Sequence, residues 1–179
     1  ARTLTDLKNC NVFTPNTKEA LFLSSEDNVE DAAKKLSEIV ELVVVTGDKN
    51  GSFAFDSRNG ESLWAPAVKV DAKDATGAGD VFLASFALAD QSGLSVRESV
   101  NFASLCGALS VTKFSGSFGA PSIDEVVDWY EANINKGSKD SSDDLADYGF
   151  LPTFAQLLTQ KKFKSIPKQQ WQKGGGPND

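Results

Sequence analysis

The sequence predicts an α/β fold, and two adjacent segments support that prediction. Residues 31–40 place apolar side chains at the 3.6-residue spacing of a helix with one buried face. Directly after them, residues 42–45 (Leu-Val-Val-Val) form the continuous apolar run that is typical of a strand covered on both faces in a parallel sheet. A helix that leads into a buried strand indicates an α/β unit.

Shorter signals extend this unit in both directions. Residues 12–15 form a brief apolar run that Pro15 stops, and the segment 16–23 then has the pattern of a helix. Further along, residues 52–56 and 63–65 are flanked by Asn-Gly turn dipeptides, which predicts a β-hairpin.

Three helices are expected to close the folded part. Residues 81–89 are apolar and rich in small side chains. Ser95 and Glu98 have the spacing of a capping box, which opens a second helix that extends to about residue 112. Pro121 marks the start of a third helix.

The composition changes after residue 134. Residues 135–147 are rich in Lys, Ser, Asp and Gly and offer too little apolar surface to fold. We therefore predict one folded unit over residues 1–134 and a polar linker with a mostly irregular tail over residues 135–179. Within that tail, only residues 150–163 have the pattern of a helix.

Composition excludes several classes of function. The chain has 18 Lys and Arg residues against 25 Asp and Glu residues, a net charge of −7, so binding to nucleic acid or to an anionic membrane surface is disfavoured. The chain contains no His, which excludes Ser-His-Asp triads and His-ligated zinc. A general base must therefore be a carboxylate, Lys, Tyr or Cys.

The cysteines and the hydropathy pattern indicate the cellular compartment in which the protein is expected. Cys10 and Cys106 are far apart in the sequence, and Cys106 lies in a run of small apolar residues that suits a buried free thiol. No apolar stretch approaches the roughly 20 residues that span a bilayer. We expect a soluble cytoplasmic protein, with an organelle of reducing interior as the alternative. The start at Ala1 suggests a processed form or a part of a longer polypeptide.

The strongest chemical signal is the sequence Gly-Ala-Gly-Asp at residues 77–80, where an extended segment meets a helix. Small residues let a ligand approach the backbone, and the amide groups at a helix N-terminus attract anions. Asp80 lies in the first turn beside that anion site, where a carboxylate can accept a proton from a substrate hydroxyl. This layout fits phosphoryl transfer. The alternative is a glycine-rich turn with Asp80 as a helix cap.

Residues 74–80 (Asp-Ala-Thr-Gly-Ala-Gly-Asp) resemble the second signature of the ribokinase-like sugar kinases, also called the phosphofructokinase-B family. Three further segments match this family in order: Asn-x-x-Glu at 16–19, the Thr and Gly turn at 46–51, and the loop at 113–121. The resemblance implies a three-layer ribokinase-like, Rossmann-like sheet with helices on both faces. It also implies that the N-terminal half and the lid of the family are missing from this chain.

The resemblance implies a role for each matching residue. Asp80 would be the general base that takes the proton from a sugar hydroxyl. The amides of Gly77, Ala78 and Gly79 would hold the charge that grows on the transferring phosphoryl group. The family transfers this group from ATP, with Mg²⁺ as the accompanying ion.

The nucleotide side of the site is implied in the same way. Asn16 and Glu19 would organise water and Mg²⁺ around the ATP phosphates, although Asn-x-x-Glu is also a capping arrangement. Thr46, Gly47 and Gly51 would border the phosphates and the ribose, with a plain β-turn as the alternative. Here Gly47 follows Thr46 directly, whereas the family usually has one residue between them.

Three more assignments complete the set of candidate site residues. Ser104 would line the adenine pocket, or serve only as a small residue in helix packing. Asp74 and Thr76 match positions that hold a monovalent cation such as K⁺, and a turn-stabilising Asp is the alternative. Lys49 and Lys113 are candidates for compensating the negative net charge locally, although most Lys side chains are simply solvated.

The resemblance implies an ATP-dependent kinase for a sugar hydroxyl, of the fructokinase or ribokinase kind. The alternatives are a catalytically inactive kinase-fold subunit with a structural role in an assembly, and a nucleoside kinase of the same fold. Because the sugar pocket of the family lies largely in its N-terminal half, we expect that missing half or a partner chain to complete the site. A homodimer is one such arrangement.

Overall fold

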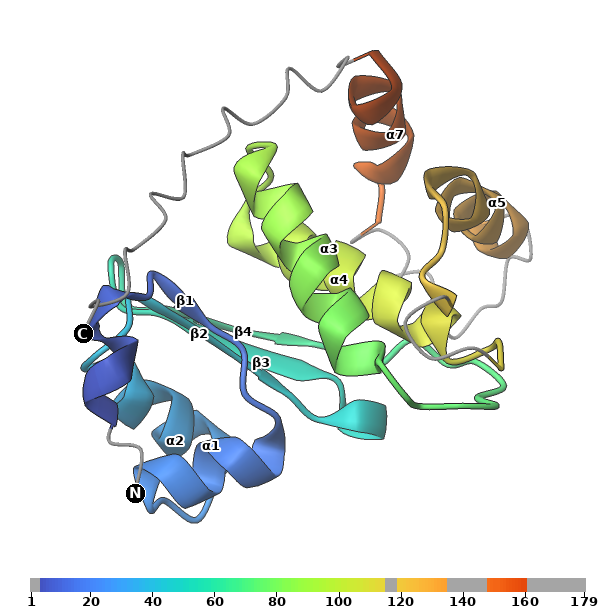
Figure 1. Ribbon diagram of the computed structural model, residues 1–179. Helices are drawn as coiled ribbons and strands as arrows, with labels where there is room; N and C mark the ends of the chain where they lie inside the picture. Colours follow the sequence, from blue (N-terminus) through green and yellow to red (C-terminus); the bar gives the residue numbers. More distant parts are fainter. Residues whose placement is uncertain (1–3, 115–118, 135–147, 161–179) are drawn as a thin grey trace, which may run out of the picture.

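The computed structural model describes residues 4–114, 119–134 and 148–160, and Figure 1 shows their arrangement. A four-stranded sheet in the order β1-β2-β3-β4 has helices on both faces, as the sequence predicts. The elements in chain order are η1 (Leu4–Asn9), β1 (Val12–Phe13), α1 (Thr17–Ser24), α2 (Val29–Leu36), β2 (Leu42–Thr46), η2 (Asp48–Asn50), β3 (Ser52–Asp56), β4 (Glu61–Ala65), α3 (Ala78–Gln91), α4 (Val96–Ser110), α5 (Ile123–Ile134) and α7 (Leu151–Gln160).

The sheet is mixed rather than parallel. β1 pairs with β2 in parallel, and the predicted hairpin of β3 and β4 continues the sheet in antiparallel register from β2. The run of apolar residues in β2 therefore indicated burial on both faces correctly, but it did not indicate the direction of its second neighbour. A fully covered strand has the same composition in a mixed sheet as in a parallel one.

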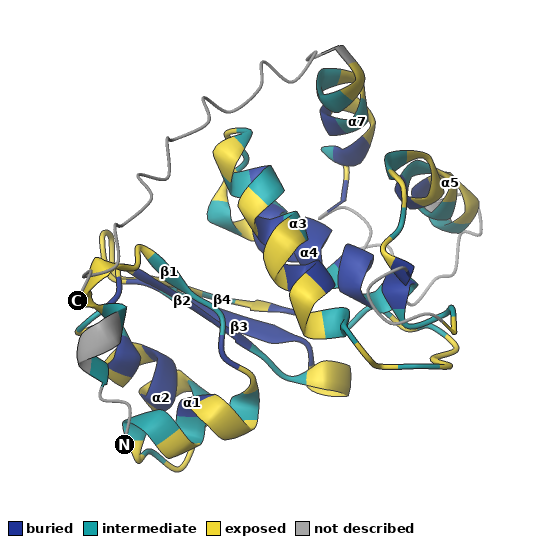
Figure 2. Ribbon diagram, in the orientation of Figure 1, coloured by how far each residue is buried: buried dark blue, intermediate teal, exposed yellow. Residues whose placement is uncertain are grey.

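Successive side chains of β2 enter two different cores, because a strand alternates its faces. Val43 and Val45 pack with Ala33 and Leu36 of α2 in one cluster. Leu42 and Val44 pack in the other, whose remaining buried members come from β3, β4, α3 and α4: Ala54, Ala65, Phe82, Phe86, Val100 and Ala103. Figure 2 shows β2 between the two helical layers, and all of its residues before Thr46 are buried. The three-layer prediction is confirmed.

A third apolar cluster lies on the side of α3 and α4 that faces away from the sheet. It joins these helices to α5 and α7. Phe154 of α7 is buried, and its ring meets the ring of Phe102 edge to face at a centroid distance of 5.0 Å. The helix predicted over 150–163 is thus present over Leu151–Gln160 and packs against the folded part. The predicted linker at 135–147 and the tail from 161 onward lie outside the described residues, so the domain boundary stays a prediction.

Side-chain caps explain most helix starts. The capping box predicted for Ser95 and Glu98 is present at the start of α4. The helix predicted over 31–40 begins earlier, at Val29, because the Asn28 side chain accepts a hydrogen bond from the Asp31 amide at 2.9 Å. This helix ends at Leu36, four residues before the end that its apolar periodicity predicted.

Both cysteines are free thiols, and Cys106 is buried as predicted while Cys10 is exposed. Burial raises the pKa of the Cys106 thiol to about 11, against a smaller lowering effect of the Ser85 hydroxyl. Within the described ranges, no helix combines the length and the hydropathy needed to cross a membrane.

The turn between β3 and β4 is fixed by an ion pair. Arg58 Nε and Nη2 donate to the two carboxylate oxygens of Asp56 at 2.8 and 2.6 Å, and the Arg58 amide donates to Oδ1 at 3.0 Å. The Asp56 side chain is buried and Arg58 is half-exposed. The Arg58 side-chain hydrogen bonds are the largest influence on Asp56, and they hold the pKa of its carboxyl below its ordinary value of 3.8.

Because the pKa of Asp56 is lower in the folded chain, this ion pair stabilises the fold fully above about pH 4 and the contribution disappears as the pH falls through the lowered value. We expect Asp56→Asn to lower the free energy of unfolding by about 1 kcal/mol at pH 7, since Arg58 is half-exposed and solvent screens the pair. The mutant should also lose less stability between pH 5 and 3. Urea denaturation across this pH range measures both effects.

Glu38→Gln is the matched control, because the Lys35–Glu38 pair is exposed on both sides. An unchanged acid response in Asp56→Asn would contradict the assignment.

Candidate active site

The parallel pairing of β1 and β2 brings two of the predicted segments together. The carboxyl ends of parallel strands lie at the same end of a sheet. At that end Asn16 forms an isolated bridge with Thr46, and the Thr46 amide donates to the Pro15 carbonyl at 2.9 Å. Asn16 and Thr46 are 30 positions apart in sequence, and the sheet makes them neighbours.

Asn16 and Glu19 form a complete capping box at the start of α1. Asn16 Oδ1 accepts from the Glu19 amide, and Glu19 Oε2 accepts from the Asn16 amide, both at 2.9 Å. The capping arrangement that the sequence left open is therefore present. It uses only one carboxylate oxygen of Glu19, and Oε1 has no hydrogen-bond partner among the described residues. Both side chains are exposed, so the cap leaves room for a second role.

The turn after β2 is closed by its own backbone. The Gly47 amide donates to the Gly51 carbonyl at 2.8 Å, and the Asn50 amide donates to the Gly47 carbonyl at 2.8 Å. Gly51 has a φ of 83°, and a Cβ at this position would lie 2.2 Å from the Ala65 carbonyl oxygen of β4. Glycine at 51 is thus required by the packing of the turn against the end of the hairpin.

Helix α3 starts differently from the other helices of the sheet layers. Side chains cap α1, α2 and α4, whereas α3 follows Gly77, at φ 82°, without a side-chain cap. The Ala78 amide makes a long hydrogen bond of 3.3 Å to the Ala75 carbonyl. An uncapped helix N-terminus with small residues is suited to bind an anion. The residues of the predicted anion site, 77–79, are therefore in the expected backbone setting.

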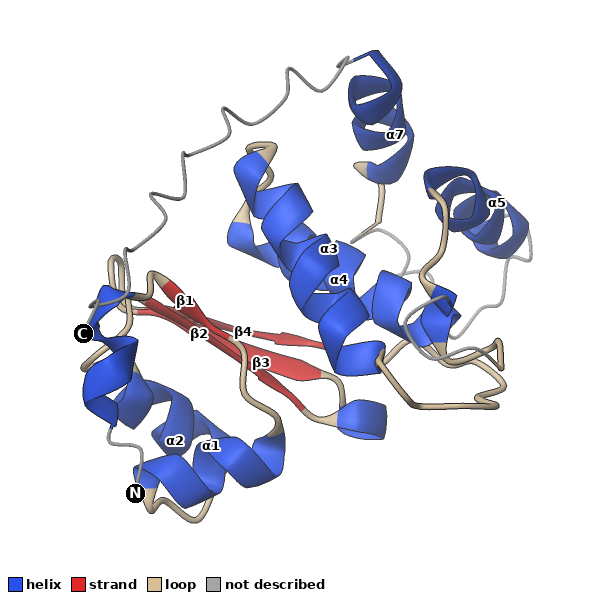
Figure 3. Ribbon diagram, viewed as in Figure 1, coloured by secondary structure: helices blue, strands red, loops and turns tan. Residues whose placement is uncertain are grey.

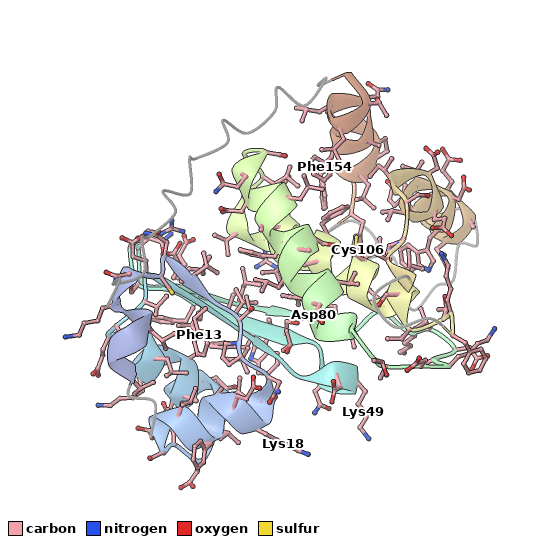
Figure 4. The ribbon with its side chains drawn as sticks, viewed as in Figure 1. Phe13, Lys18, Lys49, Asp80, Cys106 and Phe154 are labelled. Atoms are coloured by element: carbon pink, nitrogen blue, oxygen red, sulfur yellow. The ribbon has the colours of Figure 1, made fainter. Side chains whose placement is uncertain are left out.

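Asp80 is exposed in the first turn of α3, and no hydrogen bond or ion pair joins its carboxylate to another described residue. Its helix turn is held in place by Phe82, which is buried with Val44 and Ala65 over the sheet. Figure 4 shows Asp80 at the end of α3 that lies nearest to η2, where Lys49 is labelled. The start of α1 lies at the same end of the sheet. The carboxylate is thus available to a substrate and is not used as a structural ion pair.

The remaining predicted residues have clear structural surroundings. Asp74 Oδ1 accepts from the Thr76 amide at 2.9 Å, which is the turn-stabilising arrangement. The amides of Lys73 and Asp74 donate to the Val111 carbonyl at 2.7 and 3.1 Å and tie this loop to the end of α4. Asp74 also has a further contact.

Ser104 and Lys113 differ in whether their polar groups already have a partner among the described residues. Ser104 Oγ is shielded from solvent and has no hydrogen-bond partner among the described residues. A shielded hydroxyl without a partner costs free energy, so a ligand acceptor nearby would be favourable. Lys113 pairs with Glu125 at 2.6 Å, and this contact lowers the pKa of the Glu125 carboxyl. Lys113 is therefore committed to an ion pair. Residues 115–118 of the loop that follows it lie outside the described residues.

Sequence reasoning missed Thr17. Its hydroxyl donates to the Thr46 carbonyl at 3.2 Å across the two segments that the sheet brings together. The residue stands inside the Asn-x-x-Glu motif, but nothing in the sequence relates it to position 46, because that contact depends on the pairing of β1 with β2.

A model of the pfkB family of carbohydrate kinases matches residues 2–123 of this chain. Ribokinase from Schizosaccharomyces pombe is 32% identical over 126 residues, which cover 65% of this chain and 39% of that protein. The bifunctional protein HldE from Sulfurimonas denitrificans is 31% identical over 137 residues, which cover 73% of this chain and 28% of that protein.

Solved structures show the same likeness. The crystal structure of ribokinase from Thermotoga maritima matches with a TM-score of 0.67 and 32% identity, over 72% of this chain and 45% of that one. A protein from E. coli named as a putative ribokinase II, solved in complex with ATP and Mg²⁺, matches with a TM-score of 0.66 and 25% identity, over 72% of this chain and 42% of that one. This chain spans less than half the length of each of these relatives.

Two glycines of positive φ allow the cost of a steric clash to be distinguished from the cost of a strained backbone. Gly51 and Gly60 have φ values of 83° and 75°, but an added Cβ at 60 meets nothing within 4 Å, whereas one at 51 would clash with Ala65. We expect Gly60→Ala to cost about 1 kcal/mol of unfolding free energy from the strained φ alone. Gly51→Ala should cost at least about 2 kcal/mol more, because the turn must move away from β4. Equal losses in urea denaturation would show that the turn does not pack as described.

Proposed function

Because the chain belongs to the pfkB family of carbohydrate kinases, we propose that it carries the nucleotide-binding and base-bearing part of an ATP-dependent sugar kinase. The reaction is transfer of the γ-phosphoryl group of ATP to a sugar hydroxyl. One observation supports this most directly: the Asp80 carboxylate is exposed, unpaired among the described residues, and seated beside a helix N-terminus that no side chain caps.

Asp80 acts as the general base. Its carboxylate accepts the proton of the sugar hydroxyl as the oxygen attacks phosphorus, and the P–O bond to the leaving ADP breaks. The backbone of residues 77–79 stabilises the charge on the transferring group. The long bond of the Ala78 amide to Ala75 supports this role, since the amide can exchange it for a stronger charge-assisted one.

Residues 46–51 border the phosphates and the ribose of ATP, and Asn16 and Glu19 hold the hydrated metal ion. The donor set fits Mg²⁺, which usually takes one or two protein carboxylates and keeps several waters. Glu19 Oε1 is available to it, and the described residues contain no group of three or more acidic, Cys or His side chains that would form a closed metal site. When bound, Mg²⁺ neutralises negative charge on the phosphates.

The proposal has three further parts: the adenine pocket, a monovalent cation and the compartment. Ser104 lines the adenine pocket, which would give its shielded hydroxyl a partner. Asp74 and Thr76 hold a monovalent cation such as K⁺ in addition to forming a turn. A reducing compartment such as the cytoplasm suits the two free thiols.

We propose that the part of the kinase fold that the relatives have and this chain lacks packs on two open surfaces. β1 is a two-residue strand at the edge of the sheet, with only β2 as a neighbour among the described strands. On α3, Leu83 is 48% exposed, lies three residues after Asp80 and shares a face with the exposed Ala87 four residues later. A complement docked there would bring its sugar pocket to the base.

Asp80→Asn removes the base without changing the size of the side chain. In the complete protein we expect sugar phosphorylation to fall by about 10²- to 10⁴-fold, while the affinity for ATP changes little. Asp90→Asn is the control, because it makes the same change near the other end of α3. Coupled-enzyme detection of ADP gives the rate, and a titration gives the affinity. Near-normal turnover in Asp80→Asn would refute the proposal.

Glu19→Gln separates capping from metal binding. Gln also accepts a hydrogen bond from the Asn16 amide, so the unfolding free energy should change by less than about 0.5 kcal/mol. The loss of charge should weaken ATP binding several-fold when Mg²⁺ is present. It should change ATP binding little when Mg²⁺ is absent. Glu98→Gln makes the same change in the matching capping box of α4 and should alter neither. Urea denaturation measures the unfolding free energy, and calorimetric titration measures the ATP affinity with and without Mg²⁺. A folded wild-type chain with no nucleotide affinity would favour the inactive structural subunit instead.

A further inference from the structure

We propose that Thr17 is a positioning residue of the nucleotide site, which fixes the Asn16–Glu19 segment against the turn at 46–51. The expected effect on ATP binding rests on the proposed function, whereas the contact between Thr17 and Thr46 does not depend on it. The Thr17 hydroxyl is partly buried and donates to the Thr46 carbonyl at 3.2 Å. Figure 3 shows the two segments at the end of the sheet where β1 leads into α1 and β2 leads into η2.

Thr46 is the last residue of β2, and the backbone and the Thr17 side chain hold it from the α1 side. Its amide donates to the Pro15 carbonyl at 2.9 Å, and its bridge to Asn16 ends the parallel pairing. The Thr17 hydroxyl then binds its carbonyl, which belongs to the peptide group that enters Gly47. Loss of the hydroxyl would remove the side-chain link between this carbonyl and α1, while the Gly47 amide of the same peptide group would still donate to the Gly51 carbonyl within the turn.

The rest of the turn is closed on itself or on the hairpin. The hydrogen bonds between Gly47 and Gly51, Gly47 and Asn50, and Asp48 and Gly51 all stay within the turn. An added Cβ at Gly47 would lie 3.4 Å from Thr17 Oγ1, so the hydroxyl also limits the space at the start of the turn. Of the side-chain hydrogen bonds that the structure records among its described residues, the Thr17 bond is the one that links the turn to the α1 segment.

The two linked segments are those that would bind one triphosphate from two sides. Asn16 and Glu19 act through the metal ion, and the 46–51 turn acts through its backbone amides. A phosphate chain is bound well only if such groups keep a fixed separation, and small displacements of a positioned group lose much of the benefit. A hydroxyl that sets this separation therefore affects binding without touching the ligand.

Thr17→Val removes the hydroxyl and keeps the shape of the side chain, and Thr17→Ser keeps the hydroxyl. For Thr17→Val we expect faster amide hydrogen exchange at Thr46 and Gly47 and about two- to tenfold weaker binding of ATP with Mg²⁺, the range for one neutral hydrogen bond. Thr17→Ser should restore both to near the wild-type values. Exchange is measured by NMR or mass spectrometry on the full chain, and affinity by calorimetry.

Ser24→Ala is the matched control. The Ser24 hydroxyl donates to the Ala20 carbonyl at 2.7 Å on the same helix, away from the turn. Ser24→Ala should lower the free energy of unfolding about as much as Thr17→Val. It should leave amide hydrogen exchange at residues 46–47 and the affinity for ATP unchanged. Unchanged exchange in Thr17→Val overturns the proposal. Faster exchange with unchanged ATP affinity also overturns it, because Thr17 is then only structural. A wild-type chain that binds no ATP refutes the proposed function, and the exchange measurement still tests the contact.

Discussion

The burial of β2 on both faces is the constraint on which the rest of this structure depends. Leu42 and Val44 require the α3–α4 layer, and Val43 and Val45 require the layer of α1 and α2. Four consecutive apolar residues within one strand cannot be covered from one side, because their side chains alternate. Both helical layers are therefore held to the same short segment, and the turn that follows it is fixed in space by two cores at once.

The candidate site lies where this rigid centre ends. The polar groups of residues 46–51 begin at the last residue of β2, and the turn of Asp80 is held by Phe82 two residues later. Gly51 packs under the end of β4. Each polar segment thus has an apolar or closely packed neighbour that sets its position. Binding to such a site costs less ordering of the chain, since the folded core has already ordered it.

Helix capping and ligand binding draw on the same backbone groups. At α1 the capping box satisfies the amides of Asn16 and Glu19 and leaves one carboxylate oxygen of Glu19 available. At α3 no side chain takes the cap position, so the anion-binding capacity of the helix start is retained. The two helix starts therefore differ in what they offer: an exposed carboxylate oxygen at α1 and backbone amides without a side-chain cap at α3.

The sequence by itself determined the elements and the chemical character of the site. The apolar run at 42–45 predicted a doubly covered strand, the Ser95–Glu98 spacing predicted a helix start, and the residues at 77–80 predicted a glycine-rich helix entrance with a carboxylate. These signals are local, since caps, turns and periodicity depend on neighbours in the chain.

Only the tertiary structure decided how distant segments meet. The antiparallel direction of β3 beside β2, the ion pair that occupies Lys113, and the contact of Thr17 with Thr46 all join residues that the sequence leaves unrelated. The packing of Leu151 and Phe154 against α4 and α5 is of the same kind. Such contacts depend on register and on competition among partners for burial and charge, and those are settled when the whole chain packs.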